Sequence, residues 1–192
     1  AVWLDFNNDG WLDLFIGNET TEGSNHPCEL YRNNRDGTFT SCAEESGVAH
    51  KLWVKGVAAG DYDNDGRIDL YLSCLGQPNV LLHNEGPDAG DPTGSRWRFR
   101  DATEMAGVRE PLFSFPTWFF DYDNDGLLDL FVSGYRVKTA GEVYADMIGA
   151  PNDGARARLY RNLGDGRFAD VSVEAGVSKV LHADAPAYEH GL

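Results

Sequence analysis

Residues 61–69 read Asp61-Tyr62-Asp63-Asn64-Asp65-Gly66-Arg67-Ile68-Asp69, and nearly the same nine residues recur at 5–13 and 121–129. Each copy has an oxygen-bearing side chain at loop positions 1, 3, 5 and 9, and a glycine at position 6. A flexible loop that offers oxygens on alternate residues wraps around a hard cation, and the glycine permits the turn that brings position 9 back to it. The stretch therefore predicts a metal-binding loop that the chain uses three times.

The predicted ligands are the side chains at positions 1, 3, 5 and 9 and the backbone carbonyl at position 7. They are Asp5, Asn7, Asp9, Trp11 and Asp13 in the first loop, Asp61, Asp63, Asp65, Arg67 and Asp69 in the second, and Asp121, Asp123, Asp125, Leu127 and Asp129 in the third. All donors are oxygens, which favours calcium, about three ions in all. A solvated acidic turn is the plainer alternative, but carboxylates crowded on nine residues repel one another unless a cation neutralises them. Because position 4 supplies no ligand, Asp65→Ala should be more harmful than Asn64→Ala.

An EF-hand is the obvious rival, and the residues after each loop argue against it. That motif needs a glutamate at position 12 between two helices. Position 12 is Ile16, Leu72 or Val132 in this chain. The residues after position 6 alternate with period two, which is typical of a strand. Each loop is therefore predicted to join two strands of a β-hairpin.

The net charge of the chain limits the classes of partner that it can bind. The chain has 31 acidic and 16 basic residues and a net charge of -15. Eleven of the acids lie in the three loops, so three divalent ions would bring the balance to about -9. Such a surface disfavours nucleic acid and anionic membrane as partners. No apolar run reaches membrane-spanning length, which predicts no membrane insertion.

Other motifs recur at fixed offsets from the loops. Leu-Tyr-Arg-Asn occurs at 30–33 and 159–162, with Leu-Leu-His-Asn at 81–84, and Gly-Val occurs at 47–48, 107–108 and 176–177. These offsets define one unit used three times. The predicted repeats are 1–50, 51–110 and 111–178, and residues 179–192 lead into a truncated fourth repeat.

Each unit is predicted to contain four strands, the first of them before the loop, at 2–4, 57–60 and 117–120. Four-stranded repeats of this length indicate an all-β chain of about three β-propeller blades. The first two strands are apolar on both faces, which suits a sheet stacked between two others. The long connection at 135–156 has apolar residues at i,i+4 spacing, which predicts a short helix.

Three blades cannot close a ring, so we expect a fragment of a longer propeller, or self-association. Its outer blades should then expose apolar side chains that a neighbour would cover. The candidates are Trp3, Phe15, Phe119, Phe131 and Tyr160.

The three cysteines are Cys28, Cys42 and Cys74. If Leu30 pairs with Thr40 in a hairpin, Cys28 lies opposite Cys42, close enough for a disulfide. A disulfide would agree with an oxidising compartment. Three small buried hydrophobic residues are the alternative.

Together these motifs resemble the FG-GAP and VCBS repeats of calcium-binding β-propellers, which include the integrin α-chain head. The combination of Leu-Tyr-Arg-Asn, Gly-Asp-Gly-Arg-Phe at 164–168 and Ala-Gly-Val at 175–177 resembles, more narrowly, the cartilage acidic protein (ASPIC/UnbV) family. The resemblance covers residues 1 to about 178. It implies a seven-bladed, extracellular or periplasmic propeller with one calcium ion per Asp-rich hairpin.

Nothing in the sequence points to catalysis. No histidine has metal-ligand spacing with another His, Cys or Glu, and His83, which replaces the Arg of the other two repeats, is interpreted as an ordinary strand residue. The preferred function is a calcium-stabilised, non-enzymatic scaffold for extracellular recognition or adhesion, with a protein or glycan ligand and the remaining blades of the same chain as partners. The alternative is the non-catalytic portion of a propeller enzyme that acts on polysaccharide.

Overall fold

The computed structural model describes residues 1–20, 23–134, 144 and 156–177. They form three four-stranded antiparallel sheets in which each strand pairs with the next along the chain. Blade 1 contains β1 (Val2–Leu4), β2 (Asp13–Ile16), β3 (Glu29–Asn33) and β4 (Phe39–Ser41); blade 2 contains β5 (Val54–Gly60), β6 (Asp69–Cys74), β7 (Val80–Pro87) and β8 (Trp97–Asp101); blade 3 contains β9 (Ser114–Phe120), β10 (Asp129–Gly134), β11 (Arg158–Asn162) and β12 (Phe168–Asp170). The predicted all-β blades are confirmed, although β5 and β9 begin three residues earlier than expected.

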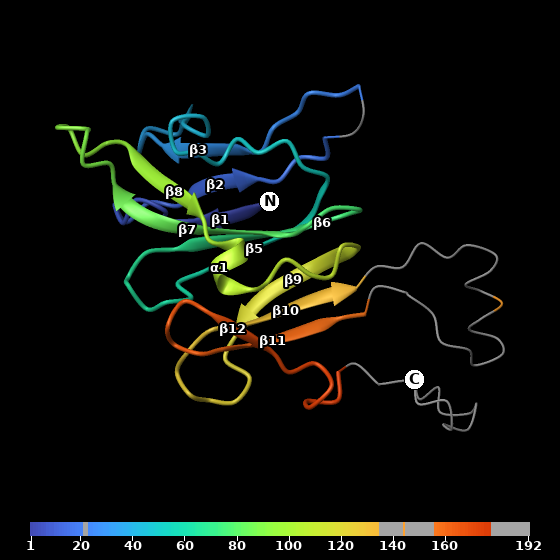
Figure 1. Cartoon of the computed structure of the whole chain (residues 1–192). Coiled ribbons are helices and arrows are strands. Elements are labelled where there is room, and N and C mark those ends of the chain that lie inside the picture. The colour runs from blue at the N-terminus through green and yellow to red at the C-terminus, as the bar shows by residue number, and fades with distance from the viewer. Residues whose placement is uncertain (21–22, 135–143, 145–155, 178–192) are drawn as a thin grey trace.

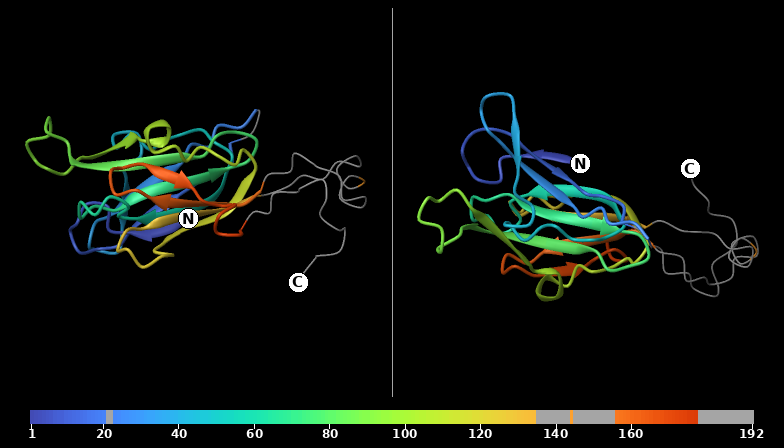
Figure 2. Two further views of the ribbon diagram at one scale, coloured as in Figure 1. Left: turned by 60° about the horizontal axis from the view of Figure 1, so that its bottom comes forward. Right: turned by 90° about the horizontal axis from the view of Figure 1, so that it is seen from above.

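The blades stack face to face in chain order, with blade 2 between the other two (Figures 1 and 2). Each Asp-rich loop connects the first two strands of its blade, and the register that closes the loops is shared. It pairs Leu4 with Asp13, Gly60 with Asp69, and Phe120 with Asp129. We name these loops loop 1 (5–13), loop 2 (61–69) and loop 3 (121–129). All three lie along the same edge of the stack, on the left in Figure 1.

Blade 2 is buried on both faces, as the apolar pattern predicts. Every residue of β6 is buried. Leu70 and Leu72 belong to an apolar cluster with Phe15 of blade 1, whereas Tyr71 belongs to a second cluster with Leu130 of blade 3. Successive residues of a strand point to opposite faces, so a single strand contributes to both interfaces between blades.

The Gly-Val motif ends the turn that follows the fourth strand. In blade 2 this turn is a short helix, α1 (Thr103–Ala106), which the sequence did not predict. The helix ends at Gly107, whose φ is 76°, and the Gly107 amide donates to the Thr103 carbonyl at 2.9 Å. The left-handed conformation favours glycine, since it has no Cβ. Val108 then turns inward and is fully buried.

The aromatic residues expected at the outer faces behave differently from one another. Trp3 is 57% exposed, and Phe119 and Phe131 are half-buried. The prediction is wrong for Phe15 and Tyr160, which are 0% and 3% exposed. Strand alternation turns both of these side chains toward blade 2, where they join the two clusters between the blades.

The predicted disulfide is wrong, because all three cysteines are free and buried. β3 and β4 pair Arg32 with Thr40, a register displaced by two residues from the expected one. The amide of Cys42 consequently donates to the carbonyl of Leu30 at 2.8 Å, so Cys42 lies opposite Leu30 and not opposite Cys28. Burial raises the pKa of the Cys42 thiol to about 11.

Two expectations fall outside the described residues: the short helix within 135–156, and the lead into a fourth repeat at 179–192. Within the described part of the chain, no helix combines the length and the apolarity needed to span a bilayer.

Candidate metal centre

The carboxylate at position 1 holds each loop closed by accepting hydrogen bonds from amides of the same loop. Asp61 accepts hydrogen bonds from the amides of Asp65 and Gly66 at 3.0 and 2.8 Å. Asp5 and Asp121 make the same two contacts in loops 1 and 3. The glycine at position 6 has φ between 84° and 87° in all three loops, which is the turn that the sequence predicted.

The carboxylate at position 9 has a structural task that the sequence did not reveal. Asp13, Asp69 and Asp129 are all fully buried. Asp69 accepts from the amide of Asn84 on β7 at 2.7 Å and from the amide of Tyr62 at 3.2 Å. The other two loops repeat this arrangement. Position 9 therefore fastens the loop to the third strand through backbone amides.

In each of loops 2 and 3 the structure brings together three of the four predicted side-chain ligands, which leaves out Asp69 in the first case and Asp125 in the second. Ligand atoms of Asp61, Asp63 and Asp65 lie within 4.8 Å of one another, and the same holds for a set of three in loop 3. That set is Asp121, Asp123 and Asp129. Oxygen-only donor sets of this kind suit calcium, which takes six to eight oxygen ligands. The residues present thus fit the predicted ion.

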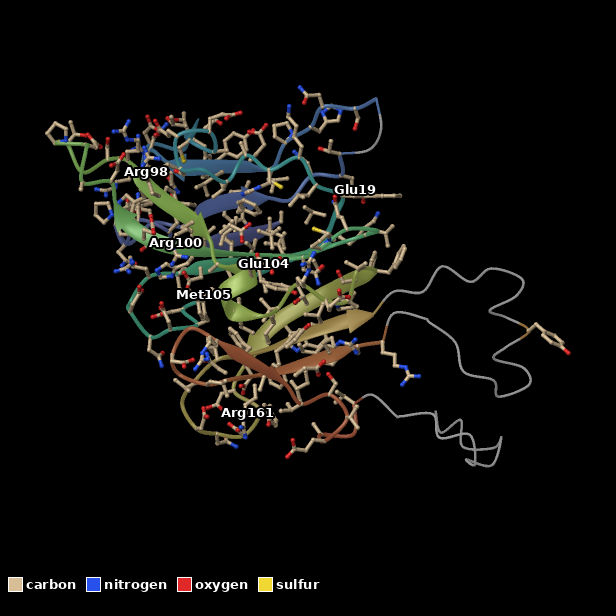
Figure 3. All side chains as sticks on the ribbon, viewed as in Figure 1. Glu19, Arg98, Arg100, Glu104, Met105 and Arg161 are labelled. Atoms are coloured by element: carbon tan, nitrogen blue, oxygen red, sulfur yellow. The ribbon has the colours of Figure 1, made fainter. Side chains whose placement is uncertain are left out.

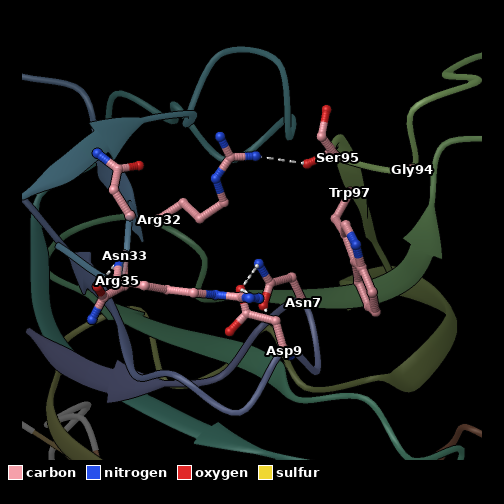
Figure 4. Close-up of a pocket in the computed structure, with 9 residues that line it drawn as sticks. Asn7, Asp9, Arg32, Asn33, Arg35, Gly94, Ser95 and Trp97 are labelled. Carbon is pink, nitrogen blue, oxygen red and sulfur yellow. Dashed lines mark hydrogen bonds and ion pairs between the residues drawn. The ribbon is translucent and has the colours of Figure 1, made fainter.

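Loop 1 has one carboxylate fewer, because Asn7 stands at position 3. Its amide nitrogen donates to Asp9 at 3.1 Å, and its oxygen accepts from the Asp9 amide at 3.2 Å. Arg35 also forms an ion pair with Asp9, at 2.9 Å, in a cavity of about 390 Å³ between blades 1 and 2 (Figure 4). A cation in loop 1 would have to compete with this guanidinium for the Asp9 carboxylate.

Loop 2 shows a similar competition and loop 3 does not. Arg67 forms an ion pair with Asp65 in loop 2. Leu127 occupies the corresponding position of loop 3, and within the described residues no ion pair involves a loop 3 carboxylate. Loop 3 therefore has four carboxylates, and no arginine in the described part of the chain competes for them.

Burial raises the pKa of several carboxyl groups in the loops. The pKa of Asp13 is raised to about 6, mainly by loss of solvation, although hydrogen bonds from the amides of Asn33 and Phe6 oppose the shift. Desolvation also raises the pKa of Asp69 and Asp129. The hydrogen bonds of each buried carboxylate thus offset only part of the cost of burying its charge, and a bound cation would offset more of it.

These shifts predict how the metal-free protein responds to pH. A folded-state pKa above the unfolded value means that the folded state binds the proton more tightly. The contribution of Asp13 to stability should therefore be complete below about pH 4 and be lost as pH rises through about 6. Urea unfolding in calcium-depleted buffer should give lower stability at pH 7 than at pH 5. Asp13→Asn should flatten this dependence, whereas stability that rises from pH 5 to pH 7 would contradict it.

The asparagine of the Leu-Tyr-Arg-Asn motif joins neighbouring blades. The Asn84 side-chain amide donates to the Ile68 carbonyl in its own blade at 3.1 Å and to the Phe6 carbonyl of blade 1 at 2.9 Å. Asn162 makes the equivalent bonds, including one of 2.7 Å to Tyr62 of blade 2. The sequence showed that this residue recurs but did not show its partners.

Replacing Asn84 should therefore weaken the interface between blades. We expect Asn84→Ala to lower the free energy of unfolding by about 2 to 4 kcal/mol, because it leaves the buried Phe6 carbonyl and the partly buried Ile68 carbonyl without this donor. Asn33→Ala is the matched control, since within the described residues Asn33 bonds only inside blade 1. It should cost about 1 kcal/mol. Equal losses in denaturant unfolding of the two variants would contradict this role.

The asparagine at position 4 also connects one loop to the next. Asn8 donates to the Gly66 carbonyl at 2.8 Å, and Asn64 donates to the Gly126 carbonyl at 3.3 Å. Both have positive φ, of 53° and 58°. Asn64→Ala would thus strain the backbone as well as remove a bond, and it is a poor control for Asp65→Ala. Asn64→Gly keeps the backbone conformation accessible.

Comparison with known proteins agrees with this geometry. A family model described as an FG-GAP-like repeat matches residues 5–72, from the start of loop 1 into β6. This stretch of the chain is an FG-GAP-like repeat. Cartilage acidic protein 1 of Xenopus tropicalis is 30% identical over 141 residues, which cover 71% of this chain and 20% of that protein. The human cartilage acidic protein 1 is 30% identical over 69% of this chain and 19% of its own length. The chain thus spans about one fifth of the length of these relatives.

Proposed function

We propose that this chain is a calcium-binding, non-enzymatic part of a β-propeller scaffold that serves recognition or adhesion outside the cytoplasm. The observation that carries the proposal is the threefold recurrence of one oxygen-rich loop sequence along one edge of the stacked blades, with three carboxylates gathered in each of loops 2 and 3. The similarity to cartilage acidic protein 1 supports an extracellular setting. In this proposal the ions brace the hairpins, and the ordered loop edge offers a rigid surface to a protein or glycan partner.

The donor chemistry supports calcium over other physiological cations for this role. Magnesium demands a small octahedral site and retains its water, whereas flexible loops with carboxylates and a backbone carbonyl suit calcium. We expect affinities in the range typical of extracellular modules, roughly 0.1 to 1 mM. A scaffold with such affinities would be loaded outside the cell and largely empty in the cytosol.

Arg35 and Arg67 predict an order of calcium affinity among the three loops. Loop 3 should bind most tightly, because it has four carboxylates and, among the residues that the structure describes, no arginine paired with position 5. Loop 1 should bind most weakly, because it has three carboxylates and the Arg35–Asp9 ion pair.

Calcium titration of the metal-free protein by calorimetry tests the proposal. We expect about three sites in the wild type and the loss of one site in Asp65→Ala, with Asn64→Gly retaining all three. Asp125→Ala should remove the tightest site. Heats that do not differ from dilution up to about 10 mM calcium, tenfold above the weakest expected affinity, would refute it.

A further inference from the structure

Loop 2 differs from the other loops in having a histidine beside it. His83 on β7 aligns with Arg32 on β3 and with Arg161 on β11, which is labelled in Figure 3. The guanidinium of Arg32 donates to the Ser95 carbonyl of blade 2, and Arg161 is exposed. The shorter histidine side chain instead lies against its own loop.

The imidazole is held between two of the loop carboxylates. Its Nδ1 atom lies 3.2 Å from Oδ1 of Asp69 and 3.4 Å from Oδ2 of Asp63. The side chain is only 13% exposed, and the ring packs edge-on against Tyr62 at a centroid distance of 6.0 Å. Although both carboxylates are close, the buried Nδ1 atom makes no hydrogen bond of acceptable geometry. Nδ1 therefore faces two loop carboxylates at ion-pair distance, and its orientation does not commit it to a well-formed hydrogen bond with either one.

The three groups have the separations of ligands on one cation. Ligand atoms of Asp63, Asp69 and His83 all lie within 4.8 Å of one another. Two donors bound to one zinc ion at 2.0–2.1 Å in tetrahedral geometry lie about 3.3 to 3.4 Å apart. The two distances from Nδ1 match that spacing, so a small displacement would suffice for all three to share an ion.

From these contacts the geometry points to a mixed nitrogen–oxygen site in loop 2 that binds zinc through His83, Asp63 and Asp69. Imidazole is a preferred ligand of zinc, whereas calcium takes oxygen ligands almost exclusively. Three protein ligands leave a fourth position for water or for a donor from a partner. The inference builds on the proposed cation binding by the loops but concerns one loop and a different metal. Among the described residues, loops 1 and 3 have no such nitrogen donor, so they serve as internal controls.

The test measures zinc and cobalt binding to the metal-free wild type and to His83→Arg, which restores the residue of the other two repeats. We expect one zinc site in the wild type, at least about 100-fold weaker in the variant, because even loss of a partner of a metal ligand costs 10- to 100-fold. Cobalt should give the strong visible absorption of a tetrahedral complex in the wild type alone. His50→Gln removes a histidine away from loop 2 and should leave both signals unchanged.

Two measurements keep the test decisive. His83→Gln serves if the arginine variant fails to fold, and zinc-dependent shifts of the His83 ring in NMR spectra of the wild type need no variant. Equal zinc affinity in the wild type and the His83 variants, or an unshifted His83 ring at saturating zinc, would overturn the inference. Calcium titration of His83→Arg separates the two proposals, because all three calcium sites should persist when the zinc site is lost.

Discussion

Calcium at about 10 mM is expected to raise the free energy of unfolding by about 4 to 8 kcal/mol over that of the metal-free protein. A ligand present at 10 to 100 times its dissociation constant stabilises the folded state by about 1.4 to 2.7 kcal/mol per site, and three sites add. The physical source is the relief of repulsion among carboxylates that burial already disfavours.

Denaturant unfolding at pH 7.5 with calcium or with a chelator measures this difference. Magnesium at the same concentration is the control for ionic strength and should have a much smaller effect. An unchanged midpoint, in protein shown by metal analysis to be calcium-loaded, would contradict the expectation. Asp65→Ala should lose about one third of the calcium-dependent increment.

Asp69→Ala should be the most damaging single substitution, and most of its cost should remain when calcium is removed. It removes the acceptor for the buried amides of Tyr62 and Asn84, and each unsatisfied donor costs about 1 to 3 kcal/mol. We therefore expect a loss of about 3 to 5 kcal/mol in chelator. Asp69→Asn, which retains one acceptor oxygen, should fall between Asp69→Ala and the wild type.

Asp65→Ala is the matched control, because Asp65 belongs to the same loop but lies near the surface. In chelator it should cost less than about 1 kcal/mol, as expected for a partly exposed ion pair. The two variants should thus separate the structural carboxylate at position 9 from the ligand at position 5. Equal costs in chelator would show that position 9 acts only as a ligand.

The sequence was sufficient for the local features of the fold. The nine-residue loop contains its own turn chemistry, and period two after it identifies the strand, so the hairpins could be predicted. The same alternation could not tell which face of blade 1 meets blade 2. Phe15 was therefore expected to be exposed, although it is fully buried.

Features that depend on distant partners were beyond the sequence. The bonds of Asn84 to Phe6 and of Asn162 to Tyr62 join residues 78 and 100 positions apart. The prediction of strand register was also wrong. β3 and β4 pair two residues away from the expected register, so Cys42 is not opposite Cys28. The substitution of His83 for arginine was visible, but its proximity to Asp63 depends on how β7 lies over loop 2.

The asparagine bonds give the stack of blades a direction. Donors at position 4 point forward to the next loop, and donors on the third strand point back to the preceding one. Both junctions between the described blades are thus head-to-tail and contain the same two hydrogen bonds, one in each direction. A whole repeat could therefore be duplicated or deleted without leaving any of these bonds without its partner. These hydrogen bonds also couple the stability of each loop to that of the next loop along the chain. Ordering one loop should therefore favour the ordered form of the adjacent loop, so calcium binding to one loop should favour calcium binding to the next.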